Sequence, residues 1–125
     1  MGLHKLFMLF HENDCLGCLD MPLFLIFGRH HAESCPANNE KTRKVAMEYF
    51  SKEKALLKKH GIKSLGSWTV IGEHLMVMVL EAPSSDAILK FMMEPELMAI
   101  SASETMEVKM AVSNEEIAKM LKLAK

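Results

Sequence analysis

Apolar and polar residues are distributed along the chain in a pattern that predicts four strands. Residues 23–27, LFLIF, are apolar throughout and lie between a proline and a glycine, which is typical of a central strand buried on both faces. Residues 62–82 contain two further apolar segments around a tight turn at Gly72-Glu73, and they predict a β-hairpin. Residues 104–112 alternate apolar and polar side chains, which predicts a fourth strand.

Apolar residues at helical spacing occupy the segments between these strands. The first helix is predicted to begin near Pro36, because proline suits the first helical turn, with Ser34 or Cys35 as its cap. It is predicted to end before Gly61, after two lysines and a histidine that favour the negative end of the helix dipole. Two more helices are predicted, one over 84–101 with a break or kink at Pro95 and one over 114–125 after a capping Ser113.

From residue 21 the order of these elements is β-α-β-β-α-β-α, which predicts an α+β, ferredoxin-like split βαβ fold followed by a C-terminal helix. Right-handed crossovers place both long helices on one face of a four-stranded antiparallel sheet. The third strand is nevertheless apolar on both faces, with one row of Leu75, Val77 and Val79 and another of Met76, Met78 and Leu80. Because an apolar sheet face in water marks an interaction surface, we expect a homodimer or higher homo-oligomer.

The size and charge of the chain exclude several classes of partner. Its 125 residues suit one domain, predicted over 21–125, whereas residues 1–20 fit no clear period and are predicted to be an N-terminal extension, either an arm or leader-derived. The net charge of −1 argues against nucleic acid and anionic membrane as partners. No run of about 18 apolar residues is present for a membrane span, and the N-terminal run LFMLF is too short for a signal peptide. A cytoplasmic location is therefore expected.

Four sequence motifs resemble known proteins, namely FGRHHAESCPANNE, KKHGIKSLGSWTV, EHLMVMVLEAPS and MEPELMAIS. Together with the order of elements, they resemble the dimeric α+β barrel superfamily. More closely, they resemble a group of small prokaryotic proteins with a GRHxxESCPxxNE signature and no established reaction. The resemblance covers residues 21–125 and implies a ferredoxin-like fold and a homodimer. The wider superfamily includes cofactor-free monooxygenases, muconolactone-type isomerases, haem-handling enzymes and stress-response proteins, so the fold alone does not choose a function.

The topology also predicts where chemically reactive side chains meet. The first and third strands are antiparallel central neighbours, so the end of one and the start of the other lie at the same edge of the sheet. The residues expected to converge there are His30 or His31, His74, Cys35, Glu33 and Glu73. Adjacent strand residues point to opposite sides, so only one of the paired histidines is expected in a site. Imidazole and thiolate together suit zinc or copper, although the spacing matches no standard ligand motif.

Without a metal, the same region suggests a pocket for an organic molecule. His30 or His74 is the predicted acid/base group, because imidazole titrates near neutral pH. Arg29 is predicted to hold an anionic group. Trp68 is predicted to wall an apolar ligand pocket, with packing in a core or an interface as the alternative.

Cysteine and methionine add two further possibilities. The three cysteines are an odd number, which argues against a disulfide framework. The 12 methionines are expected to fill the core, although soft copper sites also use methionine. A separate zinc set could be drawn from His4, His11, Cys15 and Cys18, but the H-x6-H-x3-C pattern is not a known finger spacing.

Three functions therefore stay open from the sequence. The first is binding, or cofactor-free turnover, of a small organic molecule by a homodimer. The second is binding of zinc or copper through histidine and cysteine. The third is a structural or regulatory module that only associates. The sequence contains no Ser-His-Asp pattern, phosphate loop or nucleotide fingerprint.

Overall fold

The computed structural model describes residues 22–123. Its elements are β1 (Leu23–Arg29), the single 3-10 turn η1 (Ala32–Ser34), α3 (Glu40–Lys59), β2 (Lys63–Val70), β3 (Leu75–Glu81), α4 (Ser85–Met92), α5 (Pro95–Ser101), β4 (Thr105–Ala111) and α6 (Asn114–Leu123). The predicted α+β fold and its order of strands and helices are confirmed. The predicted N-terminal extension and the candidate zinc ligands within it lie outside the described residues.

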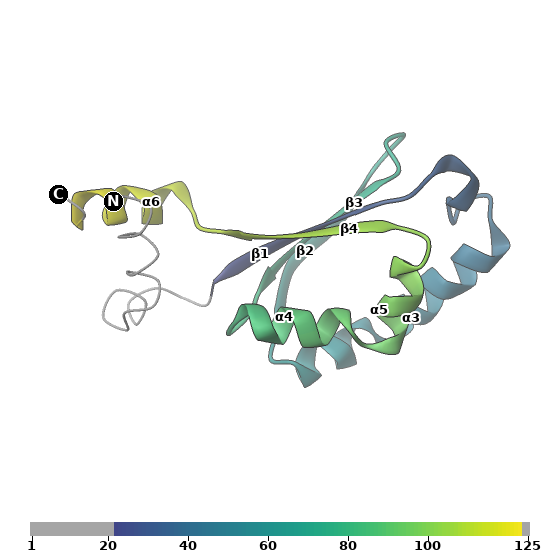
Figure 1. Ribbon diagram of the computed structural model, residues 1–125, viewed down its shortest axis with the longest axis horizontal. Coiled ribbons are helices and arrows are strands. Elements are labelled where there is room, and N and C mark those ends of the chain that lie inside the picture. The colour runs from purple at the N-terminus through teal and green to yellow at the C-terminus, as the bar shows by residue number, and fades with distance from the viewer. Residues whose placement is uncertain (1–21, 124–125) are drawn as a thin grey trace.

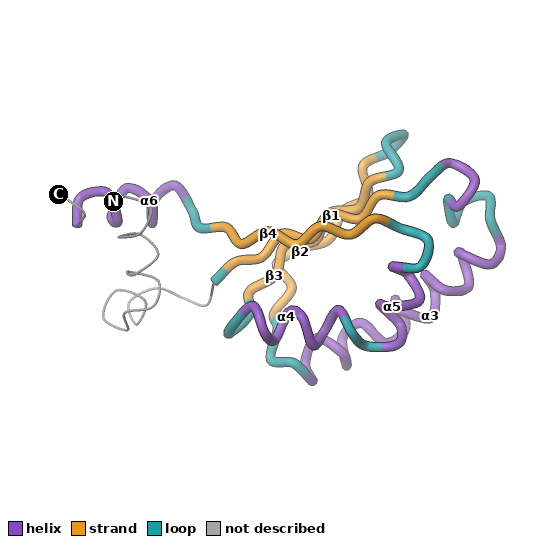
Figure 2. Tube along the Cα trace, viewed as in Figure 1, coloured by secondary structure: helices purple, strands orange, loops and turns teal. Residues whose placement is uncertain are grey.

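The four strands form one antiparallel sheet in the order β2-β3-β1-β4. β1 lies at the centre, as its uninterrupted apolar sequence predicts, and β4 forms one edge (Figure 2). Helices α3, α4 and α5 pack on a single face of the sheet, and β4 runs from α5 towards α6 (Figure 1). This layered arrangement is that of a ferredoxin-like domain.

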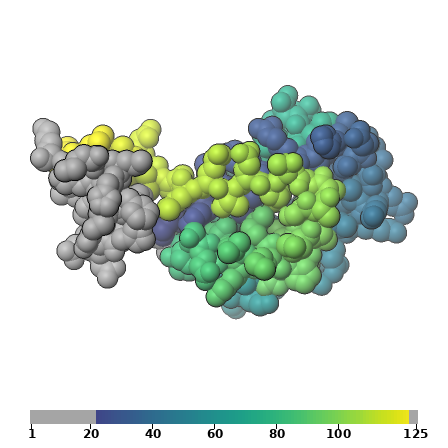
Figure 3. All heavy atoms as spheres, in the orientation of Figure 1, coloured from purple at the N-terminus to yellow at the C-terminus, as the bar shows by residue number. Residues whose placement is uncertain are grey.

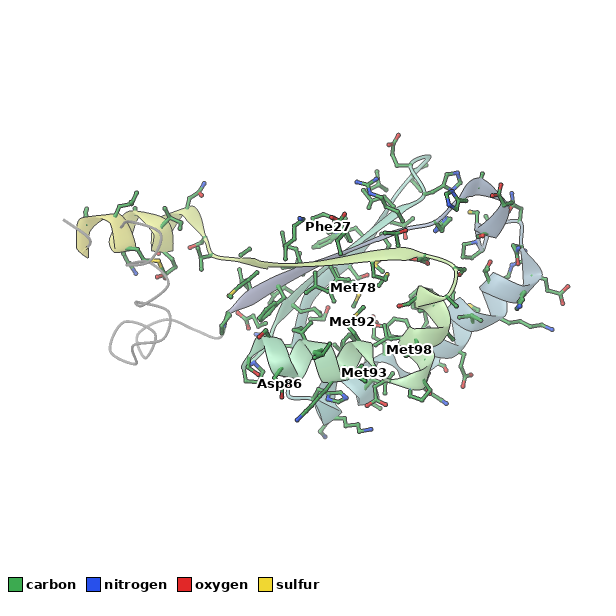
Figure 4. All side chains as sticks on the ribbon, viewed as in Figure 1. Phe27, Met78, Asp86, Met92, Met93 and Met98 are labelled. Atoms are coloured by element: carbon green, nitrogen blue, oxygen red, sulfur yellow. The ribbon has the colours of Figure 1, made fainter. Side chains whose placement is uncertain are left out.

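The core lies between the sheet and these helices. Ile26, Met78 and Leu80 point from the sheet and are fully buried, and they meet Phe91 and Leu97 from the helical layer. Strand residues two apart share a face, which is why alternate positions of β1 and β3 supply this core. In Figure 4, Met78 points towards the helices, whereas Phe27 points to the opposite side of the sheet.

The first helix begins later than predicted. Its cap is Asn39, whose side-chain oxygen accepts a hydrogen bond from the Thr42 N–H at 3.0 Å. The guanidinium of Arg43 donates to the carbonyl of Pro36 at 2.9 Å and so fixes the preceding loop. The prediction of a helix start near Pro36 is therefore wrong, and Cys35 ends the 3-10 turn η1 rather than capping α3. Asparagine competes well for a cap because its side chain reproduces the missing backbone acceptor.

The predicted helix over 84–101 is two helices. α4 ends at Met92, and α5 starts with Pro95 in its first turn. Proline has no N–H to donate and clashes with the preceding turn, so it starts a new helix here instead of kinking a continuous one. The break turns α5 towards α3, where Leu97 joins the core.

The second face of the sheet carries the other apolar row of β3 and is not covered by α3, α4 or α5 (Figure 1). The indole of Trp68 lies over Gly66 on this face and is 56% exposed. Leu25, Phe27 and Val77 lie beside it and are half-buried. The two apolar rows predicted for the third strand are therefore confirmed, and this second row forms a surface that we call the outer sheet face.

Within residues 22–123, no helix is long and apolar enough to cross a membrane. The space-filling view in Figure 3 shows β4 along the near edge of the domain, between the body and α6.

Candidate functional site

A cavity of about 260 Å³ opens between the sheet and helices α3 and α5. Its walls are mostly apolar, and its lining includes His30, Cys35, Ala46, Met76, Met78, Glu104 and Met106. We call it the His30 cavity. Its lining residues come from the sheet, from α3 and α5, and from the loops after β1 and before β4.

Two histidines meet at the wall of this cavity. The Nδ1 atom of His74 lies 3.3 Å from the Nε2 atom of His30, within hydrogen-bonding distance, and the two rings are tilted by 67°. The sulfur of Cys35 completes a group of three potential metal ligands, whose atoms all lie within 4.8 Å of one another. All three residues are half-buried.

Local backbone geometry brings His74 into this position. Its φ of 51° lies in the left-handed region, which is uncommon for a residue other than glycine. The preceding Gly72, with φ of 83°, supplies another left-handed residue in the same turn. The carbonyl of His74 then accepts a hydrogen bond from the backbone N–H of His30 at 3.2 Å. This hydrogen bond joins the turn between β2 and β3 to the end of β1.

Glu104 approaches His30 from the other side, at the loop that leads into β4. Its Oε2 atom lies 3.9 Å from His30 Nδ1. Gly28 leaves room for the carboxyl group, because a Cβ at that position would stand 2.6 Å from Glu104 Oε1. Both His30 Nδ1 and Glu104 Oε1 are buried and have no hydrogen-bond partner among residues 22–123. Unpaired buried polar atoms are costly, so a water or another polar group placed between these two atoms would be stabilising.

Burial changes the acid strength of both groups. It lowers the pKa of His30 below the ordinary histidine value, and the neighbouring imidazole of His74 lowers that pKa further. Burial raises the pKa of the Glu104 carboxyl. Their 3.9 Å separation is too long for a hydrogen bond, so the attraction does not offset the cost of burying the charges. Each group is shifted towards its neutral form.

The other predicted site residues lie apart from this group. Arg29 and His31 are exposed and line a separate polar groove on the far side of Glu104. Glu73 is exposed in the turn before His74. Trp68 lies on the outer sheet face, because β2 positions facing Val77 point away from the helices. None of these four side chains lines the His30 cavity in the single chain.

Glu104 was not singled out from the sequence. It immediately precedes Thr105, which pairs with Arg29 across the sheet, so it faces the end of β1 where His30 lies. An antiparallel neighbour for the first strand was predicted, but the register of the two strands was not. That register would have been the signal for finding this carboxylate.

The arrangement can therefore do three things chemically. It can hold the polar group of an otherwise apolar molecule between His30 and Glu104. It can exchange a proton with that molecule, because imidazole and carboxyl groups are both general acids and bases. It can also coordinate a metal ion through the two imidazoles and the thiol.

The fold resembles that of an uncharacterized NIPSNAP domain protein from Burkholderia xenovorans, with a TM-score of 0.51 and 14% sequence identity over 74% of this chain and 94% of that one. SnoaB, a cofactor-independent oxygenase from Streptomyces nogalater, aligns with a TM-score of 0.47 and 16% identity over 75% of this chain and 93% of that one. No protein-family model and no curated protein matches the chain. The first likeness supports the ferredoxin-like fold, and at this identity it extends to the fold alone.

Proposed function

We propose that the protein binds, or turns over without a cofactor, a small and largely apolar organic molecule in the His30 cavity. The cavity of about 260 Å³ lies just below the range of about 300–1,000 Å³ that is common for small-molecule sites. Its walls include the thioethers of Met76, Met78 and Met106. Methionine adapts its shape to irregular apolar ligands. A molecule of one or two rings fits these dimensions.

The single observation that carries the proposal is the unsatisfied polar pair in this apolar cavity. The side chains of His30 and Glu104 are only 11% and 14% exposed. The His30 Nδ1 and Glu104 Oε1 atoms are buried and have no hydrogen-bond partner among the described residues. A hydroxyl group can donate one hydrogen bond and accept others. A phenol or an enol would therefore satisfy both atoms while its rings occupy the apolar part of the cavity.

In turnover, His30 is the proposed acid/base group. His74 is its proposed partner, because the 3.3 Å contact between the two rings allows a proton to be shared. Glu104 is added to this set for the same reason of proximity. Arg29 lies in the neighbouring polar groove, where we propose that it attracts anionic groups to the mouth of the site.

We also propose that the chain forms a homodimer through the outer sheet face. This face exposes Trp68 beside the half-buried apolar side chains of β3 and β1, and such a contiguous apolar surface favours a partner. Its margins carry both signs of charge, with Glu107 and Lys109 on β4 and Lys63 and Glu81 at the opposite side. In a two-fold pair, acids of one copy can face lysines of the other. A second copy is thus the partner that this surface fits.

A cavity-filling substitution tests the proposed binding function. Ala46 lies on α3 and lines the His30 cavity, so Ala46→Phe should occupy the space for a ligand. Ala55 is exposed on the same helix, and Ala55→Phe is the matched control. The probes are single phenols and naphthols, measured by thermal shift and by calorimetry. We expect saturable binding that Ala46→Phe abolishes, that Glu104→Gln weakens and that Ala55→Phe leaves unchanged.

Two results would contradict this function. One is that none of these probes binds the wild-type chain saturably. The other is that binding survives Ala46→Phe, which would place the probe elsewhere. The expected cytoplasmic location stays a prediction from the sequence.

A further inference from the structure

We propose that His30, His74 and Cys35 form a binding site for a transition-metal ion of the zinc and copper class. The site uses the nitrogen of His30 that faces His74, whereas the proposed organic ligand uses the opposite nitrogen, Nδ1. The metal site therefore does not depend on the proposed binding of an organic molecule.

The distance between the two imidazoles supports the assignment. Two nitrogens that each lie about 2.0–2.1 Å from a tetrahedral zinc ion are about 3.3–3.4 Å apart. His30 Nε2 and His74 Nδ1 are 3.3 Å apart, which matches the separation of two nitrogens bound to one tetrahedral ion. The Cys35 sulfur and one ring nitrogen of each histidine all lie within 4.8 Å of one another, and a rotation of the Cys35 side chain would bring the sulfur to the Zn–S distance of about 2.3 Å.

The chemistry of the three groups narrows the choice of ion. Two imidazoles and one thiolate suit zinc and copper, whereas magnesium and calcium prefer oxygen ligands. Copper has the higher intrinsic affinity for such a set. The thioethers of Met76 and Met106 line the same cavity and would suit copper further. The donor set defines the class of ion, and the experiment decides which member binds more tightly.

The surroundings also have the features of a metal site. Metal-binding histidines usually turn their second ring nitrogen towards a carboxylate or a carbonyl, which fixes the ring. Glu104 lies on that side of His30, with its Oε2 atom 3.9 Å from Nδ1; this distance is too long for a hydrogen bond, and a closer approach of the carboxyl would supply that contact. The loop after β1 and the β2–β3 turn are joined by the hydrogen bond from His30 N–H to the His74 carbonyl. Two ligands are thus held in place before an ion arrives.

The neighbouring predicted ligands serve as internal controls. His31 and Glu73 are next to His30 and His74 in the sequence, but both are exposed and neither belongs to the three-residue group. Cys15 and Cys18 form a CxxC in the sequence and are the main competing thiols. A test on the full-length chain must separate these two from Cys35.

The experiment is titration of the metal-free, reduced, full-length protein with Co²⁺, followed by competition with Zn²⁺ and with Cu⁺. Cobalt is coloured and reports a bound thiolate by a charge-transfer band in the near ultraviolet. We expect one equivalent of Co²⁺ and a thiolate band that persist in the Cys15→Ser/Cys18→Ser double variant. The same signal should persist in His31→Ala and Glu73→Gln.

The thiolate band should disappear in Cys35→Ser. The affinity for Co²⁺ should fall by at least about 10-fold in His74→Gly and in Glu104→Gln, which is the usual effect of losing a group that supports a metal site. His74→Gly is chosen because glycine accepts the left-handed φ of that position, so the turn is kept. Far-ultraviolet circular dichroism of each variant checks that it is folded.

Two outcomes would overturn the site. One is a thiolate band that follows Cys15 and Cys18 and survives Cys35→Ser. The other is the absence of stoichiometric binding of cobalt, zinc and copper by a folded wild-type chain. If Co²⁺ binds at the three residues, its displacement by Zn²⁺ or by Cu⁺ supports the site, and the ion that displaces it at the lower concentration is the preferred one. These outcomes are independent of phenol binding, so failure of one proposal is distinguishable from failure of the other.

Discussion

The Nδ1 atom of His74 lies 3.3 Å from the Nε2 atom of His30, although 44 residues separate the two in the sequence. The contact exists because β1 and β3 are antiparallel neighbours, with Arg29 paired to Leu75 at the edge of the sheet. It also requires the left-handed backbone of His74, which ends the turn between β2 and β3. Sheet topology and one unusual φ angle together build the candidate site.

The first prediction concerns this φ angle. His74→Gly should change the free energy of unfolding by less than about 1 kcal/mol. Relief of the left-handed conformation stabilises the folded chain by about 1–2 kcal/mol. The added flexibility of the unfolded chain offsets this by about 0.5–1 kcal/mol. His31→Gly is the matched control, since His31 has φ of −76° and gains no such relief. Urea unfolding should find the control the less stable of the two. The opposite order would show that the left-handed turn is not strained.

The second prediction concerns the space over Gly28. A Cβ there would stand 2.6 Å from Glu104 Oε1 and 3.0 Å from the Met106 sulfur. Gly28→Ala should therefore destabilise the protein by about 1–3 kcal/mol, the usual cost of overpacking. In a Glu104→Ala background the cost should be smaller, because the nearest obstructing atom is gone. Urea unfolding of the four proteins measures this coupling, and strict additivity would show that the Glu104 carboxyl does not lie over Gly28.

The third prediction concerns self-association. Trp68→Asp should convert a dimer into a monomer, because it replaces the large exposed indole of the outer sheet face with a charge. Ile71→Asp is the control, since Ile71 is 90% exposed at the turn after β2 and its replacement should leave the dimer intact. Sedimentation equilibrium measures the molecular mass directly. Trp68 is the single tryptophan, so its emission in the wild-type chain should shift to longer wavelength when dilution dissociates the dimer. A wild-type chain that is monomeric at micromolar concentration would contradict the proposed dimer.

The fourth prediction concerns stability in acid. Glu94 accepts hydrogen bonds from Lys59 at 2.8 Å and from His60 at 2.6 Å. Both lower the pKa of the Glu94 carboxyl, and Lys59 has the larger effect. A carboxyl whose pKa is lower in the folded state stabilises the protein above its unfolded pKa. That stabilisation is lost as the pH falls through the folded pKa. The melting temperature should thus decrease as the pH is lowered below about 4.5, the ordinary pKa of this carboxyl group.

In Glu94→Gln this part of the acid dependence should be absent, and the melting temperature near neutral pH should be lower than in the wild type. Glu107→Gln is the control, because Glu107 is exposed and its nearest lysine contact is 3.7 Å, so it should follow the wild-type curve. Calorimetric scans at a series of pH values make the comparison. An identical acid dependence in Glu94→Gln and wild type would show that the Lys59–Glu94–His60 group does not contribute.

The fifth prediction concerns the division of the chain. A protein that begins at Met21 should melt cooperatively, because all four strands and the helices that cover them lie within residues 22–123. Within that range the sheet and the helices already enclose a core of buried apolar side chains. Circular dichroism during heating measures the transition. A broad, non-cooperative transition would show that residues 1–20 belong to the folded domain.

The order of the elements was predictable because it depends on short-range pattern. Alternation along β3 defined two apolar rows, and both lie where the alternation placed them. The opposite directions of His30 and His31 followed from the same period of two, and His30 lies inside while His31 is exposed. The chain alone thus determined the fold class, the two faces of the sheet and the edge at which the histidines meet.

Only the tertiary structure decided what surrounds them. Glu104 reaches His30 through the register of β4 against β1, and register depends on the packing of whole strands rather than on local sequence. The helix α3 starts after Asn39 and not at Pro36, because the Asn39 side chain accepts a hydrogen bond from the Thr42 N–H and caps the helix. The cavity is lined by side chains from strands, helices and loops that are distant in the sequence. A sequence pattern records what each residue prefers, whereas a site depends on distances between residues that the chain brings together only when it folds.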